Sequence, residues 1–134
     1  MIDEASTVST AVRQWEEFPV GPGDTADRLH VTLDRKGTLL LGRPVFERLG
    51  EPDAVVLLFD RINSTIGVRP AHIHQPNAYP VLTKPNVTYR LIRANRFCRH
   101  YAIRIPNTIA FDKPTIEADK VLVLDLRATR NVSR

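Results

Sequence analysis

The chain has 134 residues, of which 43% are hydrophobic and 25% are charged, a balance that is typical of a globular protein of one domain. The single cysteine, Cys98, excludes an internal disulfide framework, and no apolar run reaches the roughly 18 residues of a membrane span. The N-terminus lacks the basic and apolar regions of a secretory signal, so we expect a cytoplasmic protein with no membrane partner.

The charges are unevenly distributed along the chain. Residues 1–60 hold 6 Lys/Arg and 11 Asp/Glu, whereas residues 61–111 hold 8 Lys/Arg and no acidic residue. A run of this length without a carboxylate predicts a surface that binds anions. The alternative is that the acidic first half folds against the basic run and neutralises it, within one chain or across a dimer.

We expect residues 1–27 to form an N-terminal segment and linker, followed by a single compact β-rich domain over residues 28–134. Ser6 or Thr7 is a suitable cap for a marginal helix that carries Trp15, and a stretch rich in proline and glycine follows it. We expect Trp15 to cover an edge of the β structure, although it also has the character of an anchor for a partner.

The clearest pattern lies between residues 29 and 70. Apolar and polar residues alternate up to Asp34, which is typical of a half-buried strand, and the sequence Arg35-Lys36-Gly37 then favours a tight turn. Pro44 and Gly50 are suited to begin and end a short helix. The predicted elements are a strand at 29–34, a strand at 38–41 buried on both faces, a helix at 44–49, a buried strand at 54–59 and a returning strand at 66–69.

This order of elements resembles the AbrB/MazE-like swapped-hairpin unit, a family of small bacterial DNA-binding domains. The matching features are the strand that ends in Arg35-Lys36-Gly37, the apolar run 39–41, the helix that ends at residues 49–50, and the hairpin down to residue 70. The junction Gly42-Arg43-Pro44 departs from the family, which usually has an Ile-Pro pair there. Residues 49–71 also resemble small uncharacterised bacterial proteins.

The resemblance implies a small swapped-hairpin β-barrel that forms a homodimer and acts in transcription regulation. It also implies DNA contact through Arg35 and Lys36 in the first turn, with Arg43 beside the start of the helix. These implications belong to the family and do not follow from the composition or the spacing of residues.

In the second half, residues 71–85 contain three prolines and read as a long connection, before strands at 88–92 and 121–125 with a helix near 95–101 between them. The sequence at 40–48 is similar to that at 91–99, because each runs from a strand into a helix with Phe and Arg at equal spacing. One interpretation is a pseudo-repeat of 28–70 and 87–127. The other is an accessory β segment that completes the same barrel.

Chemical motifs are scarce. His72 and His74 share a face if their segment is extended, and Cys98 with His100 could complete a metal site, but the spacing matches no specific zinc pattern. No glycine follows Gly67, which argues against phosphate-binding glycine loops, and there is no nucleophile elbow. We therefore expect no enzyme activity, no metal and no cofactor.

The charge pattern and the resemblance together predict a nucleic-acid-binding regulatory protein that binds duplex DNA through an Arg-rich face. Arginine holds phosphates through its forked guanidinium and also reads guanine edges. The alternative function is a non-catalytic protein-interaction or self-assembly module. The predicted nucleic-acid-binding residues are Arg35, Lys36, Arg43, Arg90, Arg93, Arg96, Arg99 and Arg104.

Overall fold

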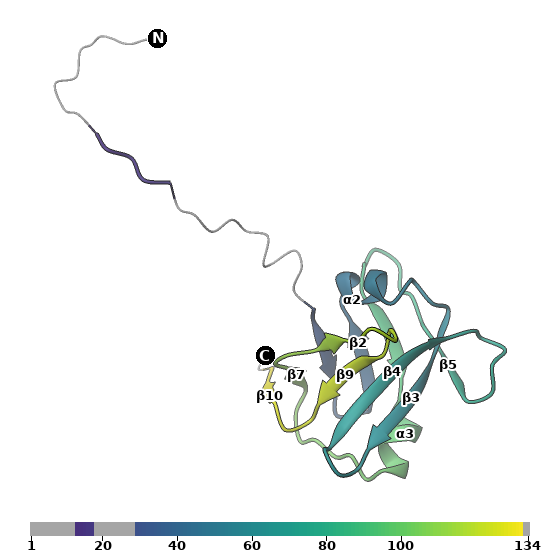
Figure 1. Ribbon diagram of the computed structural model, residues 1–134. Helices are drawn as coiled ribbons and strands as arrows, with labels where there is room; N and C mark the ends of the chain where they lie inside the picture. Colours follow the sequence, from purple (N-terminus) through teal and green to yellow (C-terminus); the bar gives the residue numbers. More distant parts are fainter. Residues whose placement is uncertain (1–12, 18–28, 133–134) are drawn as a thin grey trace.

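The computed structural model describes residues 13–17 and 29–132 of the chain. The described part is mainly β, as the sequence predicts, with short strands, two short helices and many turns (Figure 1). In chain order the elements are β1 (Val31–Leu33), β2 (Thr38–Leu41), α2 (Arg43–Arg48), β3 (Ala54–Asp60), β4 (Thr65–Ala71), β5 (Ala78–Pro80), β6 (Arg90–Arg93), α3 (Asn95–His100), β7 (Ile109–Phe111), β8 (Thr115–Ile116), β9 (Leu122–Asp125) and β10 (Thr129–Asn131).

The strands form two antiparallel sheets of five strands each. The order is β10-β7-β1-β2-β6 in the first sheet and β5-β3-β4-β9-β8 in the second. The inward-facing residues of both sheets form one hydrophobic core, in which Leu39, Ile66, Ile92 and Leu122 are fully or almost fully buried. Burial of such side chains supplies most of the stabilisation of a fold of this size.

The two sheets do not close into the barrel that the sequence predicts. They are linked at one corner by an isolated bridge, in which Leu82 and Leu91 donate N–H groups to each other's carbonyl oxygens at 2.8 and 3.0 Å. At another corner the chain turns directly from β9 into β10. β5 is an edge strand of the second sheet, and its contact with β3 continues past Pro80, where the Val81 N–H donates to the Asp53 carbonyl at 3.0 Å.

The turn between β1 and β2 is tied to α3. The Asp34 carboxylate accepts the backbone N–H groups of Lys36 and Thr38, each at 2.9 Å, and Gly37 has a φ of +90°, as the sequence predicts for this turn. The Gly37 carbonyl accepts the Ala94 N–H at 2.8 Å just before α3 begins. A Cβ atom on Gly37 would lie 2.6 Å from the Cα of Asn95, so only glycine permits this approach.

The helices α2 and α3 lie at opposite ends of the sheets (Figure 1). Each follows directly after one of the two strands β2 and β6, which pair antiparallel, so the two strands run into their helices in opposite directions. Both helices have six residues and bury the third and fourth: Val45 and Phe46 in α2, Phe97 and Cys98 in α3. Phe97 therefore corresponds in place to Val45, one position away from the match with Phe46 that the sequence comparison suggests. The pseudo-repeat itself stays a prediction.

Several details of the sequence-based prediction are wrong. The strands β2 and β3 are not buried on both faces, because Leu40, Leu57 and Leu58 are half-buried. The expected long connection at 71–85 contains β5, which pairs with β3. Trp15 does not cover an edge of the β structure, since 86% of it is exposed. Most of the expected N-terminal helix lies outside the described residues, and residues 13–17 have no regular structure.

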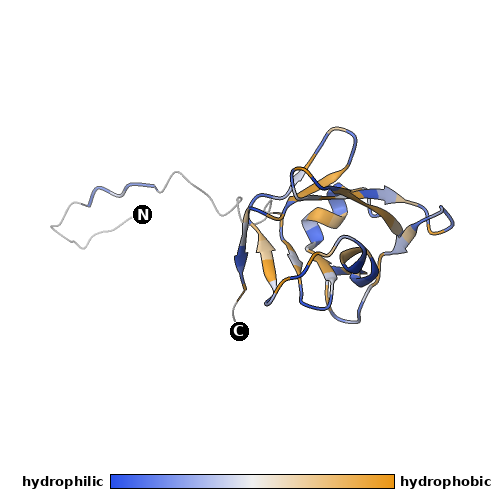
Figure 2. Cartoon of the chain, turned by 90° about the horizontal axis from the view of Figure 1, so that it is seen from below, coloured by the Kyte–Doolittle hydropathy of each residue, from blue (hydrophilic) through white to orange (hydrophobic). Residues whose placement is uncertain are grey.

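The edge of the first sheet is polar. The strand β10, next to the C-terminus, is hydrophilic, whereas its partner β7 is hydrophobic and fully buried (Figure 2). Polar residues on an edge strand discourage pairing with another chain. Within the described residues, no helix has the length and apolar character needed to cross a membrane.

Candidate functional site

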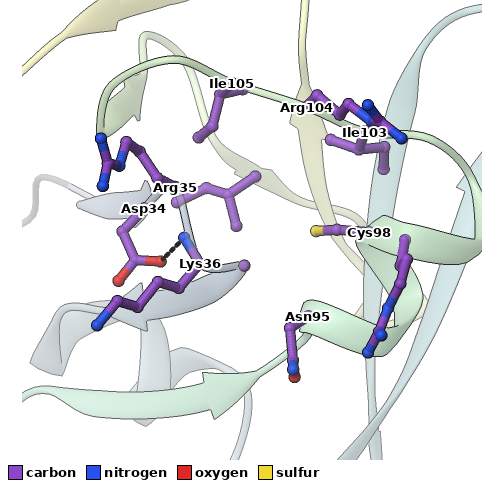
Figure 3. A pocket seen from close by; sticks show the side chains of 11 residues that line it. Asp34, Arg35, Lys36, Asn95, Cys98, Ile103, Arg104 and Ile105 are labelled. Carbon is purple, nitrogen blue, oxygen red and sulfur yellow. Dashed lines mark hydrogen bonds between the residues drawn. The ribbon is translucent and has the colours of Figure 1, made fainter.

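A hollow of about 370 Å³ lies between the β1–β2 turn, α3 and the segment that follows α3 (Figure 3). Arg35 and Lys36 of the turn lie on one side, and Arg104 lies on the other, with the Cys98 sulfur pointing toward the space between them. The hydrogen bond from Ala94 to the turn holds these two sides together. Two parts of the chain that are distant in sequence, the β1–β2 turn and residues 95–105, therefore meet at one place on the surface.

The charge of this hollow is strongly positive. Arg35, Lys36, Arg99 and Arg104 line it and are all exposed, whereas Asp34 is the only acidic residue in its lining. The Asp34 carboxylate is already engaged with two backbone N–H groups of its own turn. None of the ion pairs in the described residues includes one of the four cations, so they remain available to an anion from solution.

Among the residues that the structure describes, ion pairs do not neutralise the basic run. In the described part of the chain the ion pairs are Arg43 with Glu47, Arg127 with Asp125, and Arg130 with Asp112. None of them includes a residue from 61–111. Within residues 13–17 and 29–132, the alternative that acids of the first half neutralise the run is therefore not supported by ion pairs inside one chain.

Two further predicted residues extend this region. Arg93 lies opposite Thr38 in the pairing of β6 with β2, next to the turn. Arg96 and Arg99 are three residues apart on α3, a spacing that makes them neighbours on a helix surface. The basic end, as we call it below, consists of Arg35, Lys36, Arg93, Arg96, Arg99 and Arg104, all of them exposed.

The structure does not bring Arg43 and Arg90 to the basic end. Arg43 begins α2, separated from the turn by the four residues of β2 or roughly 13 Å of extended chain, and its Nε donates to Glu47 at 2.8 Å. The Arg90 guanidinium lies over the Phe46 ring, 4.5 Å from its centroid, and its Nη1 donates to the Thr88 carbonyl at 2.9 Å. Arg90 is half-buried and packs against α2, so its contacts are structural.

The histidines and the cysteine do not form a site together. Cys98 lines the hollow of the basic end, whereas His100 lines a different hollow on the other side of α3. Burial raises the pKa of the Cys98 thiol above its ordinary value of 9.0, and the Asp34 carboxylate raises it further. His72 and His74 are exposed in the turn after β4. Among the residues described, no three His, Cys, Asp or Glu side chains are grouped to hold a metal.

Sequence reasoning missed three residues of this region. Asp34 orders the turn, and an Asp directly before a predicted turn is a recognisable signal for such hydrogen bonds. Asn95 begins α3 and lines the hollow, but nothing in the sequence distinguishes it from other polar residues. Arg61 reaches α3 from the β3–β4 turn, with its Cζ 5.0 Å from the Tyr101 ring centroid. That contact joins segments that the sequence does not show to be close.

Comparison of the chain with protein-family models, with curated proteins and with solved structures gives no match.

Proposed function

We propose that the protein is a cytoplasmic, DNA-binding regulatory protein that binds duplex DNA through the basic end. The observation that carries the proposal is the convergence of four exposed cations from two distant parts of the chain on one hollow, with a single acid in its lining. The resemblance of residues 29–70 to the AbrB/MazE-like family supports the same role for Arg35 and Lys36. The other support is the run of 51 residues without a carboxylate, in which Arg93, Arg96, Arg99 and Arg104 lie.

The chemistry of the basic end suits a phosphodiester backbone. Five of its six members are arginines, whose guanidinium groups donate two parallel hydrogen bonds to one phosphate. Arg35 and Lys36 lie on a tight turn, and a turn can approach a groove more closely than a broad sheet face can. We assign phosphate contacts to Arg99 and Arg104 and a base-reading position to Arg35.

The test is the salt dependence of binding to a labelled duplex. Each cation that contacts a phosphate contributes close to one unit to the slope of log K against log salt. The double variant Arg99→Ala/Arg104→Ala should therefore bind more weakly at low salt and flatten this slope by roughly two units. The far-UV circular dichroism spectrum should not change, because both side chains are exposed.

The matched control is Arg43→Ala/Arg48→Ala, which removes two exposed arginines from α2 at the opposite end. We expect the slope of this variant to equal that of the wild type. Equal losses in the two double variants would show general attraction to a basic protein and would contradict the assignment to the basic end. A wild type that does not bind duplex DNA at low salt would refute the proposed function.

A second candidate function, a non-catalytic protein-interaction or self-assembly module, is favoured by one observation. Trp15 is 86% exposed, and tryptophan is the residue type most enriched at the energetic centres of protein interfaces. Glu16 and Glu17 follow it, so this short segment combines a large apolar side chain with two negative charges. A homodimer in which this segment binds a second copy is the form of the module that we develop next.

A further inference from the structure

A second hollow, of about 640 Å³, lies on the side of α3 that faces away from the β1–β2 turn residues. It is formed by α3 together with Leu57 of β3 and the strand β5 with its preceding turn. Its apolar lining includes Phe97, Tyr79 and Tyr101, and the rings of Phe97 and Tyr101 have centroids 5.1 Å apart. This hollow is large enough to accept an aromatic side chain of another segment.

The rim of the hollow is positive. Arg96 and His100 line it, no acidic residue does, and Arg99 is the neighbour of Arg96 on the surface of α3. The His100 and Tyr101 rings pack edge to face, with centroids 4.7 Å apart, which holds one wall of the hollow in place. A ligand that fits this hollow has an aromatic group and adjacent negative charge.

The described part of the chain contains one segment in which an exposed aromatic side chain adjoins acidic residues. Trp15 is the only tryptophan of the protein, and Glu16 and Glu17 follow it directly. Within its own chain Trp15 has 86% of its surface exposed, so it does not occupy the hollow of the same copy. Tryptophan is enriched at the energetic centres of protein interfaces, so an exposed Trp15 beside two acids is suited to bind a partner.

We propose that Trp15 of one copy inserts into the hollow between α3, β3 and β5 of a second copy. The indole packs against Tyr79, Phe97 and Tyr101, and Glu16 and Glu17 pair with the cations on α3. Because each copy has one segment and one hollow, the exchange is reciprocal and closes as a two-fold dimer. This inference gives the second candidate function a defined partner, a second copy of the chain, and it holds whether or not the basic end binds DNA.

The single tryptophan makes the proposal directly measurable, because all indole fluorescence comes from Trp15. In the full-length chain we expect blue-shifted emission and protection from acrylamide quenching at high concentration. Both should be lost on dilution, at the same concentration at which sedimentation velocity shows dimer dissociation. Protection that does not depend on concentration would mean docking within one chain, and a quenchable Trp15 at all concentrations would mean no docking. Either result overturns the proposal.

The charge-reversal variant Arg96→Glu keeps the fluorescent reporter and changes only an exposed side chain of the rim. We expect its dimer dissociation constant to rise by about tenfold or more, because the reversal replaces attraction to Glu16 and Glu17 with repulsion. The matched control is Arg43→Glu, which reverses an exposed helix arginine on α2 and should leave dimerisation unchanged. An equal loss in both variants would show attraction by net charge alone and would refute the assignment to the hollow.

A mixing experiment tests the exchange between copies. A Trp15→Ala chain has an intact hollow but no tryptophan, whereas an Arg96→Glu chain has the tryptophan but a defective hollow. Adding the first to the second should restore protection of the remaining Trp15 and produce a heterodimer in sedimentation. Failure of the mixture to protect Trp15, while the wild type alone does, would contradict insertion between copies. DNA is absent from all of these measurements, so their outcome is independent of the DNA-binding test.

Discussion

The α2 end and the α3 end of the molecule share their local architecture but differ in charge. In both, a strand of the antiparallel β2–β6 pair is followed within two residues by a helix of six residues. At the α2 end the exposed Arg43 is paired with Glu47, and further acids follow at Glu51 and Asp53. At the α3 end, Arg96, Arg99 and His100 have no acid on their helix. Similar backbones can therefore present different surfaces, and function has to be inferred from side chains.

The turns at the two ends also differ, and glycine substitutions should reveal the difference most clearly. Gly37 and Gly50 have φ values of +90° and +89°, but a Cβ on Gly37 meets the Asn95 backbone and a Cβ on Gly50 meets nothing within 4 Å. We expect Gly50→Ala to lower the free energy of unfolding by about 1 kcal/mol through backbone strain, and Gly37→Ala by about 3 kcal/mol. Urea unfolding measures both. Equal losses would contradict the close packing of the turn on α3.

Asp34 both orders the β1–β2 turn at the α3 end, through two hydrogen bonds, and contributes a negative charge there. Removing both of its hydrogen bonds in Asp34→Ala should cost about 1 to 2 kcal/mol of unfolding free energy. Asp34→Asn keeps an oxygen acceptor and removes the negative charge, so it should cost less and bind duplex DNA more tightly at low salt. Glu47→Gln at the α2 end is the matched control for DNA binding. Tighter binding by this control as well would argue against a local effect of Asp34.

Cys98 gives the α3 end a dependence on alkaline pH. Burial raises the pKa of its thiol in the folded state, so the folded protein holds this proton more tightly than the unfolded chain does. The contribution to stability is therefore complete below the ordinary pKa of 9.0 and is lost as the pH rises above it. Urea unfolding at neutral and alkaline pH should show a smaller alkaline loss for Cys98→Ala than for the wild type. Equal losses would contradict a buried, protonated thiol.

The smallest expected effect lies at the α2 end. The Arg43–Glu47 pair is exposed on both sides and spans one helical turn, so a double-mutant cycle should give a coupling of about 0.3 to 0.5 kcal/mol that decreases with added salt. Circular dichroism of thermal unfolding for Arg43→Ala, Glu47→Ala and the double variant measures it. A coupling several times larger would mean that the charges of this end are less solvated than their exposure indicates.

The sequence predicted the elements of the fold well where local signals decide them. Alternation, Pro44, Gly37 and Gly50 correctly mark the first two strands, α2 and the turns beside them. The sequence did not predict β5, because its residues follow a proline-rich stretch and pair with β3 only through long-range contacts. The order of the strands in each sheet also depends on long-range pairing, and so does the fact that the two sheets do not close into a barrel. No local sequence pattern encodes such pairing.

The candidate site was predictable to a similar extent. Counting charges located Arg93, Arg96, Arg99 and Arg104 in one acid-free run, and the turn residues came from the family resemblance. The sequence could not show which of these cations lie close together on the folded surface. Arg90 belongs to the same run, yet it packs over Phe46 at the opposite end because of the direction of β6. Only the fold shows that Arg90 has a structural role, whereas the arginines of the basic end are exposed and can bind an anion.

The central strands of the two sheets are β1 and β4, and each has one pairing partner that lies much later in the sequence. β1 pairs with β2 immediately, but its other edge pairs with β7, where Thr32 lies opposite Ala110. β4 likewise pairs with β3 immediately, but its other edge pairs with β9, where Ile66 lies opposite Leu124. Pairing between strands so far apart in sequence slows folding, because a long stretch of chain must form a closed loop before the two strands can stabilise each other. On the ribosome, the first two hairpins would emerge with open edges, so the nascent chain is most vulnerable to aggregation until β7 and β9 leave the exit tunnel.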